Sequence, residues 1–148
     1  MTGLEGWEVE FYADESGREP CREWMETLTP QKRIALEEAI RLVLARRGLG
    51  VMETEFGKAL GGGLYEFRLR WSAAEVQRKV EGASAETAAK AEKIMLRLFF
   101  CTSGRKIILL LIGYDKARDP GSTRQGREIA RARKLLTAHE EAERRRKR

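Results

Sequence analysis

A regular alternation of apolar and charged side chains in residues 64–71 constrains the fold more than any other stretch of this sequence. The apolar positions are Tyr65, Phe67, Leu69 and Trp71, and the charged positions between them are Glu66, Arg68 and Arg70. Alternate side chains of a β-strand lie on opposite faces of its sheet. We therefore predict a strand that packs one face on a core and carries charge on the other. Three glycines precede it, and we interpret residues 61–63 as a hinge where the backbone turns tightly.

Residues 95–102, MLRLFFCT, repeat this arrangement. Leu96, Leu98 and Phe100 alternate with another set, in which Arg97 shares its face with Phe99 and Cys101. Two strands thus offer arginine on what we expect to be a common surface, and this is where we look for function.

The other elements follow from periodicity and stop signals. Residues 7–12 alternate like a half-buried strand. Pro20 begins a short amphipathic helix, and Thr29 and Pro30 begin a second helix that runs to about Arg47, before Gly48. Residues 49–60 are interpreted as a connection. Residues 106–114, KIILLLIGY, are apolar on both faces and are expected to form the central strand. A last helix should reach about residue 143.

These elements predict an α+β domain with a small, twisted antiparallel sheet of about four strands. An N-terminal helical hairpin packs against this sheet, and a C-terminal helix follows. Residues 1–143 are expected to form a single domain, with an alanine-rich, charged insertion at about 72–93 and a basic tail at 144–148. A length of 148 residues suits one domain with its own core.

The composition favours a cytoplasmic protein. Its longest apolar run, residues 107–112, is too short to span a membrane, and the first residues lack a signal-peptide pattern. The chain has two cysteines, Cys21 and Cys101. We expect two buried free thiols, with a disulfide as the alternative.

Positive charge is concentrated in the second part of the chain. Residues 1–57 contain 7 basic and 12 acidic side chains, and residues 58–148 contain 22 and 11, so the net charges are −5 and +11. This asymmetry favours a polyanionic partner, either nucleic acid or an acidic protein segment. The alternative is a soluble basic surface with a solvated tail.

Side chains for metal binding or nucleophilic catalysis are scarce. His139 is the single histidine, and neither cysteine has the spacing of a metal-ligand motif. Glu66 is the only acid on the arginine face of its strand, which disfavours a two-metal phosphodiesterase. We expect neither a metal nor another cofactor.

What remains is a set of cations that the predicted sheet could bring together near one aromatic residue, Tyr114. The cations are Lys58, Arg68, Arg70, Arg97, Lys116 and Arg118. Arginine binds non-bridging phosphate oxygens through forked donors. Metal-free RNA cleavage needs such stabilisation, the ribose 2′-hydroxyl as nucleophile, and a group that moves protons. The alternative is that each arginine is solvated or ion-paired.

The order of four motifs resembles the RelE/ParE superfamily of type II toxin-antitoxin toxins, and most closely its phage-derived HigB-like branch. The motifs are KALGGGLYEFRLRW, LRLFF, KIILLLIGYDKARDP and REIARARKLL. The resemblance covers residues 58 to about 136 apart from the insertion. It implies a RelE-like fold, a cognate antitoxin that is often a helix-turn-helix protein, and a ribosome-dependent endoribonuclease that cleaves mRNA and inhibits translation.

The resemblance also implies roles for individual residues. Arg68 and Arg97 correspond to phosphate-stabilising arginines, and Tyr114 to an aromatic residue that transfers a proton or stacks on a base. Lys58 and Lys116 correspond to the family's lysines and, with Arg70 and Arg118, would bind RNA. The 2′-hydroxyl would attack the adjacent phosphate and leave a 2′,3′-cyclic phosphate. Two alternatives remain: a non-enzymatic, ParE-like inhibitor of DNA gyrase, and an inactive relative that acts as an antitoxin-bound corepressor.

Overall fold

The computed structural model describes residues 6–70, 75, 78 and 94–147. In chain order the first half contains β1 (Glu8–Phe11), α1 (Pro20–Glu26), α2 (Pro30–Ala39), the π-helical turn η1 (Ile40–Leu44), α3 (Ala45–Arg47) and the 3₁₀ segment η2 (Gly48–Glu53). The second half contains β2 (Gly57–Gly61), β3 (Leu64–Leu69), β4 (Leu96–Thr102), β5 (Ile107–Asp115) and α5 (Ser122–Arg146). The α+β class is confirmed.

The strands form one open sheet in the order β1-β5-β4-β3-β2. Strands β2 to β5 pair in an antiparallel meander, whereas β1 pairs in parallel with β5. The prediction of about four antiparallel strands is therefore wrong in two respects, because the sheet has five strands and is mixed. The apolar strand β5 is an interior strand as its sequence suggested, but β4 occupies the middle.

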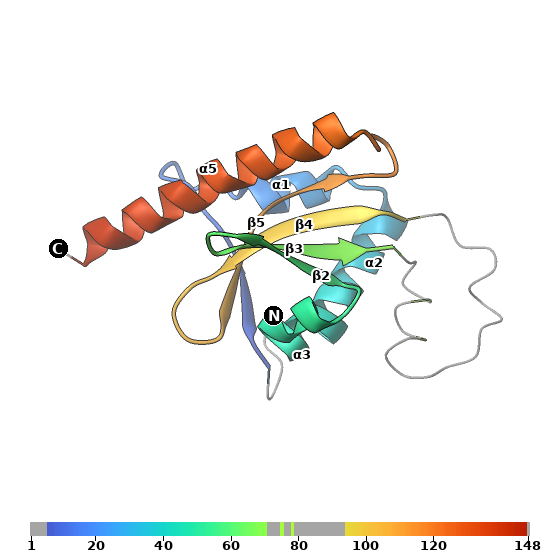
Figure 1. Ribbon diagram of the computed structural model, residues 1–148, viewed down its shortest axis with the longest axis horizontal. Coiled ribbons are helices and arrows are strands. Elements are labelled where there is room, and N and C mark those ends of the chain that lie inside the picture. Colours follow the sequence, from blue (N-terminus) through green and yellow to red (C-terminus); the bar gives the residue numbers. More distant parts are fainter. Residues whose placement is uncertain (1–5, 71–74, 76–77, 79–93, 148) are drawn as a thin grey trace.

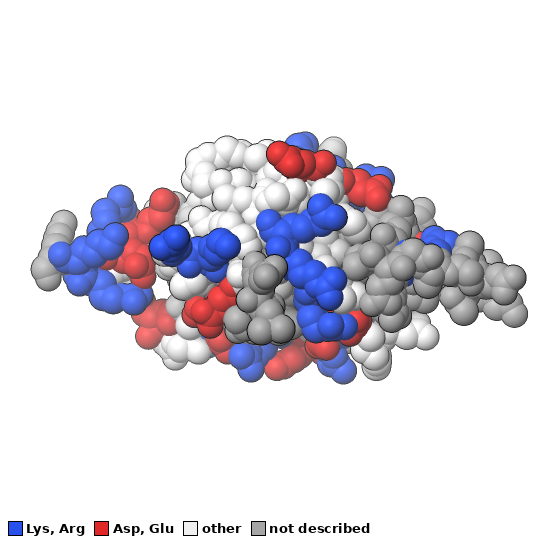
Figure 2. Space-filling model, turned by 90° about the horizontal axis from the view of Figure 1, so that it is seen from below, with Lys and Arg blue, Asp and Glu red and all other residues white. Residues whose placement is uncertain are grey.

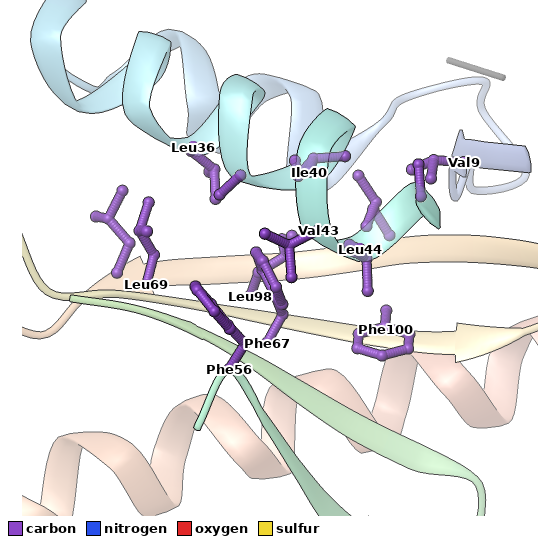
Figure 3. Packing of buried hydrophobic residues seen from close by; sticks show 14 of the residues in the cluster. Val9, Leu36, Ile40, Val43, Leu44, Phe56, Phe67, Leu69, Leu98 and Phe100 are labelled. Carbon is purple, nitrogen blue, oxygen red and sulfur yellow. The ribbon is translucent and has the colours of Figure 1, made fainter. Parts of the chain in front are cut away.

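The first face of the sheet is covered by the helical segment from α2 to α3. Thr29 caps α2 by accepting a hydrogen bond from the backbone N–H of Lys32 at 3.4 Å, and Gly48 ends the segment with φ of 54°. Leu36, Ile40 and Val43 point from this segment towards the sheet (Figure 3). This face is an apolar core, and the strand residues that meet the helical segment there are fully buried: Phe67, Leu69, Leu98 and Phe100.

The second face is covered by α5, which runs along the sheet on the side away from α2 (Figure 1). Ala132 and Leu136 of α5 pack there with Phe99 and other strand residues. The charged side chains of β3 and β4 lie on this face, as predicted, but they do not simply face solvent. Glu66 and Arg97 are 0% and 1% exposed. Alternation in a strand identifies the charged face but does not reveal that a helix covers it.

The predicted connection before β3 contains a strand of its own. Residues 57–61 form β2, which pairs with β3, so residues 61–63 turn a β-hairpin instead of acting as a free hinge. Gly61, Gly62 and Gly63 all have positive φ, between 64° and 88°. Glycine adopts this backbone region without the steric cost that a Cβ brings, which explains the triplet.

Several smaller predictions have definite outcomes. Cys21 and Cys101 are buried and free, as expected. The last helix continues to Arg146, so most of the predicted basic tail is helical; its exposed arginines lie at the left end of Figure 2. The predicted insertion at 72–93 lies outside the described residues, apart from two isolated positions. Among the described helices, none has the length and apolar character that a membrane span requires.

Candidate functional site

A row of three side chains crosses the α5-covered face of the sheet. Arg68 on β3 is the direct cross-strand partner of Arg97 on β4, and Arg97 is the direct partner of Tyr114 on β5. Cross-strand partners in antiparallel strands share a face and lie about 5 Å apart. Strand pairing thus brings together the three residues that the sequence singled out for catalysis, although they are distant from one another along the chain.

Glu66 holds the two arginines of this row from within β3. Its Oε1 accepts a hydrogen bond from Arg68 Nε at 2.6 Å and lies 4.0 Å from Arg97 Nε. The Arg68 side chain remains 23% exposed, whereas that of Arg97 is 1% exposed. Arg97 also donates from Nη1 to the carbonyl oxygen of Leu96 at 3.5 Å. The predicted alternative of an ion-paired arginine is therefore correct for Arg68, whose Nε is paired with Glu66.

Three buried polar atoms in this group lack a hydrogen-bond partner among the described residues. They are Glu66 Oε2, Arg97 Nε and the Tyr114 hydroxyl. A buried polar group without a partner costs on the order of 1–3 kcal/mol, so folded proteins contain few of them. Their concentration on three neighbouring strands marks a buried polar group that contains both donors and acceptors without partners among the described residues.

Burial and neighbouring charges shift the ionisation of these groups. Burial lowers the pKa of Arg97, with Arg68 and Arg70 acting in the same direction and Glu66 opposing them. Burial also raises the pKa of Tyr114, and the negative charge of Glu66 adds to this effect. The tyrosine hydroxyl is therefore a neutral proton donor at neutral pH.

Lys116 lies close enough to this group for its charge to be affected. Desolvation lowers the pKa of Lys116, and repulsion from Arg97, Arg68 and Arg70 adds to the decrease. Its backbone N–H donates to the carbonyl oxygen of Met95 at 2.8 Å, which fixes the chain just after β5 beside the start of β4. Lys116 and Arg70 thus extend the cationic group beyond the strand ends.

Two predicted RNA-binding residues lie outside this group. Lys58 on β2 is the cross-strand partner of Glu66, so it shares the same face, and it is exposed. Arg118 follows β5 and lines a neighbouring cleft with a volume of about 620 Å³. Tyr114 also lines this cleft and therefore stands between Arg118 and the two strand arginines.

Sequence reasoning missed a buried ion pair at this cleft. Lys32 Nζ lies 2.6 Å from Asp115 Oδ2, and the two side chains are 8% and 9% exposed. Asp115 Oδ1 also accepts from the backbone N–H of Ala117 at 3.0 Å. This pair ties the start of α2 to the segment that carries Tyr114. The sequence contained one indication that Lys32 is buried. Lys32 precedes the buried Leu36 by one helical turn and so lies on the side of α2 that faces the sheet.

Among the residues that the structure describes, no group of three or more His, Cys, Asp or Glu side chains is placed to hold a metal ion. The geometry instead brings together guanidinium groups, a neutral phenol, a carboxylate and a lysine with a lowered pKa on one side of the sheet, with the phenol, the carboxylate and Arg97 buried. Comparison of the chain with protein-family models and with curated proteins gave no match.

Proposed function

We propose that this protein is the toxin of a type II toxin-antitoxin system and acts as a metal-free endoribonuclease on mRNA at the ribosome. The observation that carries the proposal is the row Arg68, Arg97 and Tyr114 on three adjacent strands, with buried polar atoms that lack partners among the described residues. The order of motifs that resembles the RelE/ParE superfamily supports the same assignment. The partners would be a cognate antitoxin, the ribosome and mRNA.

The two arginines would stabilise the reacting phosphate. Attack by the 2′-hydroxyl on the adjacent phosphorus adds negative charge to the non-bridging oxygens in the transition state. Guanidinium groups fixed on neighbouring strands are oriented before the reaction, so they stabilise this charge without further reorganisation. Arg97 is held by burial and Arg68 by its bond to Glu66, and both are therefore preorganised.

Proton transfer would use groups on the same face. Glu66 Oε2 has no partner among the described residues, and it would take the proton of the 2′-hydroxyl once the side chains that bury it move aside. Tyr114, whose pKa burial raises, would donate a proton to the departing 5′-oxygen. The products are a 2′,3′-cyclic phosphate and a 5′-hydroxyl. Lys116, whose pKa is lowered by desolvation and by Arg97, Arg68 and Arg70, would bind the phosphate beside Arg97.

The test is to map mRNA ends after brief induction of the protein. We expect cuts that carry 2′,3′-cyclic phosphates, and a decrease in kcat of about 10²–10³ in Arg97→Met, as for the loss of one oriented donor. Arg105→Gln is the matched control, because Arg105 is exposed in the β4–β5 turn, away from the row. Cleavage by Arg97→Met at the wild-type rate, with the fold intact by circular dichroism, would contradict the proposal.

One observation favours a second candidate, a non-enzymatic inhibitor like the ParE members of the superfamily. Glu66 already engages Arg68 and lies near Arg97, which would reduce the capacity of both to bind phosphate. In that case induction would leave translation normal and damage DNA, and Arg97→Met would retain toxicity. An inactive corepressor would cause no growth arrest at all.

A further inference from the structure

The cleft beside Tyr114 lies at the end of β5, between the α1–α2 junction and the first turns of α5. We call it the Trp24 cleft; Trp24, Thr27, Tyr114, Arg118 and Arg131 are among its lining residues. Its volume of about 620 Å³ falls within the range of small-molecule sites, about 300–1,000 Å³. It is therefore large enough for one nucleotide.

The ion pairs of the cleft leave two of its described cations available. Lys32 is paired with Asp115, and Arg124 binds both Asp119 at 2.6 Å and Glu128 at 2.8 Å. Within the described part of the chain, Arg118 and Arg131 have no ion-pair or hydrogen-bond partner, and both are exposed. Each acid of the cleft is thus paired, although Asp119 and Glu128 share the single charge of Arg124. With Arg118 and Arg131 the four cations exceed the three acids of the cleft by one, which leaves a net positive charge to bind an anion.

Trp24 gives the cleft an aromatic wall. A Cβ placed on Gly113 would collide with the Trp24 ring, so the indole is packed directly against the backbone of β5. Trp24, Thr27 and Arg131 also line a second hollow of about 510 Å³ between α1 and α5. The aromatic ring and Arg131 therefore stand where the two hollows meet, and the depression continues away from Tyr114.

We propose that the Trp24 cleft binds the RNA nucleotide adjacent to the cleaved phosphate, with its base against Trp24 and its phosphate between Arg118 and Arg131. This inference rests on the proposed function. Arg97 and Tyr114 are cross-strand partners and Tyr114 lines the cleft, so the cleft begins at the strand next to the one that carries Arg97, about 4.8 Å away. Aromatic rings and cations along a groove are the usual means of holding single-stranded nucleic acid.

These features favour RNA over a protein segment. The cleft adjoins the polar row directly through Tyr114, whose buried hydroxyl has no partner among the described residues. Its available charges are both positive and lie beside an aromatic ring. An RNA chain bound in the cleft would therefore lie beside the row, in which Arg68 is 23% exposed and Arg97 and Tyr114 are buried.

The test measures binding of 2′-O-methyl RNA hexamers of A, C, G or U, which lack the nucleophile, to the full chain. We expect quenching of tryptophan fluorescence that Trp24→Phe removes. The double variant Arg118→Gln/Arg131→Gln should raise Kd about tenfold and reduce the salt dependence by about one ion for each lost phosphate contact. Arg105→Gln should change neither quantity. In cleavage assays the double variant should raise KM with little change in kcat.

The outcomes separate this inference from the proposed function. If the double variant binds hexamers like Arg105→Gln, or if Trp24→Phe retains the quenching, the inference is wrong, even where Arg97→Met still abolishes cleavage. Loss of binding to a protein partner with unchanged RNA binding would make the cleft a protein-docking surface and would also overturn it. If the wild-type chain neither binds nor cleaves RNA, both proposals are wrong.

Discussion

Helices cover both faces of the sheet, but the side chains buried on the two faces differ in polarity. The face under α2 is closed by hydrocarbon side chains such as Leu36, Phe67 and Leu98. The face under α5 combines a smaller apolar cluster with buried Glu66 and Arg97. Burial of apolar surface stabilises a fold, whereas burial of charge costs free energy unless partners offset it. We infer that the first face supplies stability and the second supplies chemistry.

The largest expected loss of stability follows from a substitution on the α2-covered face. Phe67 is fully buried and stacks on Phe56, with 6.0 Å between ring centroids. Phe67→Ala should lower the free energy of unfolding by about 4 kcal/mol, measured by urea denaturation. The exposed Ile34 is the control, and Ile34→Ala should change stability by less than about 0.5 kcal/mol. A loss below about 1 kcal/mol in Phe67→Ala would contradict the comparison.

A slightly smaller loss of stability should follow from removing the Glu66 charge beside Arg97 on the α5-covered face. Glu66→Gln leaves Arg97 buried without its counter-charge, so we expect a loss of about 3 kcal/mol. The double variant Glu66→Gln/Arg97→Met should recover most of that stability without recovering RNA cleavage. Urea denaturation and cleavage assays on the same preparations measure both. Equal losses in the single and double variants would show that the cost of Glu66→Gln does not come from an uncompensated charge on Arg97.

Changes at the β2–β3 hairpin, to which α5 is attached, should affect stability less than the two preceding substitutions. Arg133 donates to the carbonyl oxygens of Leu60 and Gly61 at 2.6 and 3.1 Å, and Gly62 has φ of 64°. Gly62→Ala should cost about 1.5 kcal/mol, because an alanine is strained in this backbone region. Gly126 lies on the exposed side of α5, away from the helix ends. Gly126→Ala should therefore stabilise the protein and raise the thermal midpoint.

The smallest expected effect on stability comes from pH, through the one buried thiol on each face of the sheet. Burial raises the pKa of Cys101 from 9.0 to about 12, and it raises the pKa of Cys21 as well. Above pH 9 the unfolded chain loses these protons and the folded chain retains them, so stability should fall as pH rises. At about pH 9.5 the loss should be about 0.8 kcal/mol for each thiol.

Urea midpoints between about pH 8 and about pH 9.5 measure this loss. Cys101→Ala should reduce the slope of stability against pH by about half, since Cys21 continues to contribute. A slope that Cys101→Ala leaves unchanged would mean that the thiol on the α5-covered face ionises as freely in the folded chain as in the unfolded one.

The sequence predicted the elements whose signals are local. Pro20, Thr29 and Gly48 mark helix ends by local backbone preferences and side-chain capping, which do not depend on distant residues. The faces of β3 and β4 followed from alternation, whereas the register that places Arg68 opposite Arg97 did not. By contrast, β2 was missed because its short, largely exposed sequence has no strong alternation.

The features that sequence reasoning missed depend on contacts between distant segments. Lys32 and Asp115 are separated by 83 positions, and no local pattern connects them. Similarly, a strand that alternates charged and apolar residues has the same pattern whether solvent or a helix covers its charged face. The burial of Glu66 and Arg97 depends on where α5 packs, which their own strands do not encode.

The parallel pairing of β1 with β5 has a consequence for biosynthesis. Glu8 pairs with Ile107 and Phe11 with Leu110, so β1 finds its neighbour only after about a hundred further residues have been made. Contacts between such distant positions form late, because a long loop must close first. The first strand therefore emerges from the ribosome unpaired, and Tyr114 joins the two arginines only after β5 has been made.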